Sequence, residues 1–138
     1  MGRDESRAVT PQFRSPLIVE DDGGRFVLTA PLVYDSLVLQ VALTVPAGFP
    51  TDFASIPRGL WNILPPVGKY DAAAMCHDWL YQTGMYHGVT VDRGDADRVL
   101  LEAMEVLGVA RWQRWAIYLG VRIGGAGIWR GYREKVSV

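Results

Sequence analysis

The hydrophobic pattern of the sequence changes at a proline-rich connector, and this change constrains the fold more than any other feature. Before the connector, large apolar residues occupy alternate positions from Leu37 to Val45, which is the period of a β-strand. After it, an alanine-rich run from Tyr70 to Tyr81 contains no helix breaker before Gly84. The connector, residues 49–66, carries four of the eight prolines. Because strands precede helices, the sequence predicts an α+β fold rather than alternating βαβ units.

The predicted fold is a small N-terminal antiparallel sheet of three or four strands, followed by three main α-helices. Strands are expected at 17–19, 25–29, 32–34 and 37–45, with a hairpin turn at 21–24. Helices are expected at 70–81, 95–107 and 110–132, and one short helical turn at 57–64 with Ser55 as its cap. The charged segment 1–15 is expected to be a flexible polar arm, and residues 16–138 a single α+β domain.

The composition excludes several classes of protein. Hydrophobic residues make up 49% of the 138 residues, enough to build a core, so the chain is not disordered as a whole. A net charge of −1 provides no general attraction for nucleic acid. The lone cysteine, Cys76, cannot form an intramolecular disulfide, and from the polar residues at the start of the sequence we expect no secretory signal. We therefore expect a reducing cytoplasm, or a particle assembled there.

The residues with the clearest chemical potential lie on the first two predicted helices. His77 and Tyr81 are four residues apart and share a helix face, whereas Asp78 points about 100° away from His77. If the second helix packs antiparallel against the first, Asp97 meets His77 and Tyr81. A carboxylate on one imidazole nitrogen makes the other a better base. The same pair also serves, without turnover, as a clasp between two helices.

Other polar residues allow more than one interpretation. Asp78 and Asp52 are candidate ligands for a hard cation such as calcium. Asp52 fits equally an Asx-turn, a helix cap or a local pair with Arg58. Cys76 is expected to be a small core residue and His87 a solvated loop residue.

The final predicted helix combines tryptophan, tyrosine and arginine with few other polar residues. Its apolar run is too short for a membrane span and Arg122 interrupts it, so we expect no span. A buried helix, a docking face for another subunit and a membrane-surface segment remain open. From Gly108 on, six basic residues accompany one acidic residue, whereas residues 71–105 contain seven acidic and two basic residues. This separation of charge favours contacts with other subunits in an assembly.

Two resemblances extend this interpretation. The run from Ala72 to Tyr81, with the later Ala96-Asp97-Arg98, resembles the catalytic helices of phospholipase A2 enzymes, closest to the parvovirus capsid type. The resemblance implies that His77 is the general base, Asp97 its partner, Tyr81 a supporting donor and Asp78 the calcium ligand.

The second resemblance covers most of the chain. Five segments of the chain are similar to a phage and prophage family known as domain of unknown function 1353. These segments are Val45 to Arg58, Leu64-Pro65-Pro66, His77 to Tyr81, Ala96-Asp97-Arg98 and the final Trp112 to Arg122. This resemblance implies a tailed-phage or prophage origin.

Together these observations predict a tail- or neck-associated component of a virion, made in the host cytoplasm and then assembled into the particle. Its partners would be other phage structural proteins or further copies of itself. The alternative is a calcium-dependent, phospholipase A2-like hydrolase that acts on a lipid or a cell-envelope ester.

Overall fold

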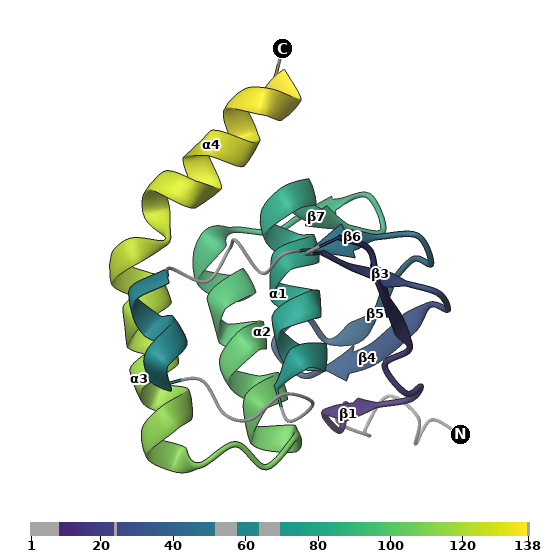
Figure 1. Cartoon of the computed structure of the whole chain (residues 1–138), viewed down its shortest axis with the longest axis horizontal. Coiled ribbons are helices and arrows are strands. Elements are labelled where there is room, and N and C mark those ends of the chain that lie inside the picture. The colour runs from purple at the N-terminus through teal and green to yellow at the C-terminus, as the bar shows by residue number, and fades with distance from the viewer. Residues whose placement is uncertain (1–8, 24, 52–57, 64–69, 138) are drawn as a thin grey trace, which may run out of the picture.

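The computed structural model describes residues 9–23, 25–51, 58–63 and 70–137. Antiparallel strands lie on one side of the molecule, two helices pack across them, and a third helix packs against one of those two (Figure 1). The predicted α+β class, with strands first and helices afterwards, is confirmed.

The strands form two small antiparallel sheets and a hairpin. The first sheet consists of β1 (Gln12–Phe13), β4 (Leu32–Ser36) and β5 (Val41–Val45), in the order β1-β4-β5. The second sheet consists of β2 (Val19–Asp21), β3 (Phe26–Leu28) and β6 (Pro50–Thr51), in the order β2-β3-β6. β7 (Met85–Tyr86) and β8 (Val89–Thr90) pair in a loop where no strands were expected.

The strand region differs from the sequence prediction in two places. β1 lies inside the segment expected to be a flexible arm, where Phe13 pairs with Tyr34 and the Arg14 side chain contacts Asp35. These contacts hold the end of that segment against β4. The predicted strand 37–45 is a turn followed by β5, because a glutamate from a later helix binds the backbone at residues 37 and 38.

The helices are η1 (Arg58–Ile63, a 3₁₀-helix), α1 (Asp71–Thr83), α2 (Arg93–Val106), α3 (Arg111–Gly124) and α4 (Ala126–Ser137). The described residues thus contain four α-helices, and the predicted helix 110–132 is divided at Gly125. The close approach of Gly125 to α1 explains why glycine occupies the break. A Cβ atom there would lie 2.5 Å from the Val121 carbonyl oxygen and 2.6 Å from the Tyr81 hydroxyl.

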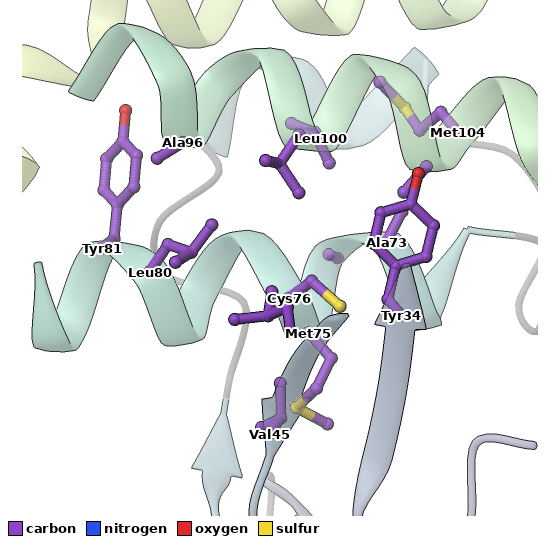
Figure 2. Close-up of a cluster of buried hydrophobic side chains, with 14 of the residues drawn as sticks. Tyr34, Val45, Ala73, Met75, Cys76, Leu80, Tyr81, Ala96, Leu100 and Met104 are labelled. Carbon is purple, nitrogen blue, oxygen red and sulfur yellow. The ribbon is translucent and has the colours of Figure 1, made fainter. Parts of the chain in front are cut away.

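The core fills the space between α1, α2 and the first sheet. Figure 2 shows α1 and α2 running antiparallel, with Leu80 and Leu100 between them and Tyr34 reaching up from β4 toward Met104. Four alanines on these helices have no exposed surface, which allows the two backbones to approach closely: Ala73, Ala74, Ala96 and Ala103. Among the described residues, no helix has both the length and the apolar character needed to cross a membrane.

The C-terminal end of α1 is tightly positioned. Gly84 caps the C-terminus with φ 69°, the left-handed conformation that glycine adopts without strain. Arg133 of α4 donates from Nη2 to the carbonyl oxygens of Tyr81 and Gln82 at 2.6 and 2.9 Å. A cation at this end of a helix interacts favourably with the helix dipole. The region around Tyr81 is therefore held from the side of α4 as well as from α2.

Candidate functional site

The antiparallel packing of α1 and α2 brings His77, Tyr81 and Asp97 together. His77 donates from Nε2 to Asp97 Oδ1 at 2.8 Å. Tyr81 donates its hydroxyl proton to the same oxygen at 2.7 Å, and its ring centroid lies 4.3 Å from that of His77. The predicted meeting of these side chains is therefore present, whereas the catalytic roles assigned to them stay predictions.

Two arginines complete the surroundings of Asp97. Arg122 of α3 donates from Nη1 to Asp97 Oδ2 at 2.9 Å, and Arg93 of α2 donates from Nη1 to the same oxygen at 3.3 Å. Arg93 also donates to the carbonyl oxygens of Val121 and Arg122, near the C-terminal end of α3. Asp97 thus connects three helices, and we call these five side chains the Asp97 network.

Sequence reasoning did not place the two arginines in the site. Arg93 precedes Asp97 by four residues, a spacing that puts two side chains on one helix face and that was available as a signal. Arg122 lies 25 residues away, and only the packing of α3 on α2 brings it to the carboxylate.

The network is buried and strongly polarised. His77 and Asp97 are both 0% exposed. Burial alone would raise the pKa of Asp97, but hydrogen bonds from His77, Tyr81 and Arg122 outweigh it and hold the pKa below its usual value. Burial, with Asp97 as the next cause, raises the pKa of Tyr81, so its hydroxyl stays a proton donor. The arrangement stabilises a carboxylate that is ionised and inaccessible to bulk water.

Asp78 points to a different set of partners. Its Oδ2 accepts hydrogen bonds from the Thr51 hydroxyl of β6 and from Gln82 Nε2, the latter at 2.8 Å. These contacts connect α1 to the second sheet. Within the described ranges, no group of three or more His, Cys, Asp or Glu side chains could hold a metal ion. The calcium-ligand role of Asp78 stays a prediction.

The remaining sequence candidates have mixed outcomes. Asp52 and Ser55 lie outside the described residues, so the metal-ligand and cap predictions for them stay predictions.

Cys76 is fully buried in the core, as expected, and burial raises the pKa of its thiol. His87 is exposed, as expected, although its Nε2 lies 2.8 Å from the Ala42 carbonyl oxygen. Asp92 caps α2, because its side chain accepts from the Asp95 amide at 2.7 Å.

A second carboxylate on α2 was missing from the sequence interpretation. Glu102 Oε1 accepts hydrogen bonds from the hydroxyls of Tyr34 and Ser36, both at 2.9 Å. Its Oε2 accepts from the backbone amides of Leu37 and Val38 at 2.9 and 3.1 Å. We call this group the Glu102 network. It fixes the turn between β4 and β5 on α2.

Comparison with known proteins places the chain in a family without assigning it a reaction. No curated protein and no solved structure matches it. A family model described as "Protein of unknown function (DUF1353)" matches residues 26–121, more than half of the chain. The matched region includes β3 to β8, α1 and α2, and therefore the Glu102 network and every member of the Asp97 network except Arg122. The chain belongs to this family of proteins of unknown function, DUF1353.

Proposed function

We propose that the protein is a non-catalytic component of a phage- or prophage-encoded particle, associated with its tail or neck. In this proposal the Asp97 network is a structural clasp between α1, α2 and α3. The phage assignment rests on the family resemblance drawn from the sequence motifs. Synthesis in the host cytoplasm and later incorporation into the virion are part of the same proposal.

The observation that carries the structural role is the burial of His77. A general base has to reach a water molecule and its substrate, and the His77 side chain has no exposed surface. Its Nε2 is committed to Asp97, whose other oxygen is already shared by two guanidinium groups. Such a closed set of charge-assisted hydrogen bonds fits the fixing of helix positions better than proton transfer to a substrate.

A comparison of two substitutions tests the clasp. His77→Ala removes one partner of a buried, charged pair and should lower the melting temperature by about 5 °C or more. His77→Gln keeps an N–H donor near Asp97 and should recover part of this loss. Differential scanning calorimetry measures both variants. A wild-type protein that hydrolyses esters, and a His77→Gln variant of unchanged stability that does not, would contradict the proposal.

The particle assignment has a separate test. Virions purified from an induced strain that encodes this chain should contain it in fixed proportion to known structural proteins, as measured by quantitative mass spectrometry. Its absence from washed particles, with the chain still abundant in the lysate, would argue against a virion component.

A second candidate function is a phospholipase A2-like hydrolase. The observation in its favour is that His77 and Tyr81 converge on Asp97 Oδ1, as the phospholipase resemblance implies. In this alternative His77 takes a proton from water and Asp97 orients the imidazole. Binding of calcium by Asp78 and Asp52 stays a prediction. Isothermal titration with calcium, together with phospholipid and ester hydrolysis by wild type and Asp78→Asn, tests it. If the wild type shows no heat of calcium binding and no hydrolysis, this candidate is excluded.

A further inference from the structure

Four large apolar side chains on α3 are exposed in one row along the helix. Trp112, Trp115, Leu119 and Ile123 have exposed fractions of 65%, 43%, 53% and 85%. Their spacing of three, four and four residues puts them on one face, which we call the α3 stripe. The opposite face of α3 packs on α2 and η1. In Figure 1, α3 lies at the margin of the molecule, on the side away from the sheets.

The composition of this face favours a protein partner over a lipid surface. Tryptophan and arginine are the residues most enriched where protein interfaces gain their binding energy. Binding to anionic lipid depends on uncompensated basic charge, at about 1 kcal/mol for each Lys or Arg. Arg122 is engaged with Asp97, and Arg114 with the Val109 carbonyl and Glu105. Two of the three arginines of α3 are therefore already engaged within the molecule.

The sizes of the side chains indicate which protein fits the stripe. Both tryptophans lie toward the N-terminal end, and the smaller Leu119 and Ile123 lie toward the C-terminal end. When two copies of α3 pack antiparallel, Trp112 faces Ile123 of the second copy and Trp115 faces its Leu119. Each bulky ring then meets a smaller side chain. A parallel arrangement would oppose ring to ring at one end of the helix.

The surface of the stripe is large enough for such a contact. At about 150–250 Å² for a fully exposed side chain of this size, its four exposed fractions correspond to roughly 500 Å² of apolar area per copy. Two copies would bury about 1,000 Å², the lower bound for a specific interface, before the rim is counted.

We propose that the α3 stripe is the interface of a symmetric homodimer in which the two α3 helices pack antiparallel. An isologous contact of this kind uses one patch twice and closes on itself. The inference goes beyond the proposed function and does not depend on it, since it rests on α3 alone and not on the Asp97 network.

Sedimentation velocity over a broad dilution series tests the interface. The wild type should show a concentration-dependent dimer. Ile123→Glu should raise the dimer dissociation constant at least tenfold, because it puts a charge into the stripe. Val89→Glu is the matched control, since Val89 is 51% exposed on β8, and it should leave the constant unchanged. Circular dichroism should show the same thermal transition in the monomeric fractions of both variants.

Disulfide trapping tests the direction of packing. Trp112→Cys mixed with Ile123→Cys should form a mixed disulfide on mild oxidation. Either variant alone should not crosslink, because about 16 Å of helix would separate the two equivalent positions. Cys76 is buried and does not compete.

Three results would overturn the proposal. These are a wild type that stays monomeric at every concentration, a dimer that Ile123→Glu leaves intact, and an efficient 112–112 crosslink. A monomeric wild type that binds phosphatidylglycerol vesicles through Trp112 and Ile123 would replace the dimer with a lipid-binding face. A virion role could survive any of these results, so the two proposals fail separately.

Discussion

Two carboxylates on α2 hold the molecule together in different ways. Asp97 is fully buried and binds an imidazole, a phenol and two guanidinium groups from α1, α2 and α3. Glu102, five residues later, binds two hydroxyls and two backbone amides from the β4–β5 turn. The first network joins helix to helix with charged partners, and the second joins helix to sheet with neutral ones. From this difference we expect that the stability lost when a carboxylate is removed depends on the charges of the partners that remain.

The largest expected effect is therefore at Asp97. Asp97→Asn leaves two buried or half-buried arginines and His77 facing a neutral amide, and should cost about 3–5 kcal/mol in the free energy of unfolding. Urea denaturation followed by tryptophan fluorescence measures this cost. Arg122→Gln, at a half-exposed position, should cost less and gives a milder version if Asp97→Asn does not fold. Losses below about 1 kcal/mol in both variants would mean that the network does not act as a clasp.

Acid should weaken the Asp97 network through the same carboxylate. The pKa of Asp97 is lowered in the folded state, so its contribution is fully present above the unfolded value of about 3.9. The contribution is lost as the pH falls below that value toward the lowered one. The stability difference between wild type and Asp97→Asn should therefore be constant from about pH 7 to pH 5 and shrink below about pH 4. Urea unfolding of both proteins across this range provides the measurement, and a difference that grows in acid would reverse the expected sign.

The Glu102 network should be the weaker of the two. Glu102→Gln keeps the shape but replaces an accepting oxygen with an amide NH₂, which cannot accept from the amides of Leu37 and Val38. The expected cost is about 1–3 kcal/mol, because the stranded partners are neutral and partly reach solvent. Hydrogen exchange should lose protection at residues 37 and 38 first, while α1 stays protected. Glu105→Gln, at a 69% exposed side chain of the same helix, is the matched control and should change neither quantity.

The two networks also differ in how far the sequence predicts them. The HDxxY spacing and an Asp at the start of the next helix are enough to predict that His77, Tyr81 and Asp97 meet, given antiparallel helices. No local pattern singles out Glu102, because its partners are backbone amides and hydroxyls more than 60 residues away. The same contacts explain why residues 37–40 form a turn although the alternation from Leu37 to Val45 predicts a strand. Tertiary hydrogen bonds outweighed the local strand preference there.

The break between α3 and α4 is a second feature that the local sequence pattern did not predict. Residues 110–132 are uniformly apolar and basic, so their pattern predicts one helix. The helix is interrupted at Gly125, where the Tyr81 hydroxyl occupies the space that a side chain would need. The class of fold and the helix pair were thus predictable from periodicity, whereas the turns and breaks were set by residues far away in the chain.

The smallest expected effect is at an exposed ion pair on the same helix. Arg98 Nη1 lies 2.5 Å from Asp95 Oδ1, shorter than either guanidinium contact of Asp97, yet both side chains are more than one third exposed. Water solvates both groups after either is removed, so the pair should contribute less than about 0.5 kcal/mol. Asp95→Asn and Arg98→Gln should therefore leave the urea midpoint almost unchanged, in contrast to Asp97→Asn two residues away. A loss at Asp95 comparable to that at Asp97 would show that contact distance, rather than burial and stranded charge, determines the ranking of these carboxylates.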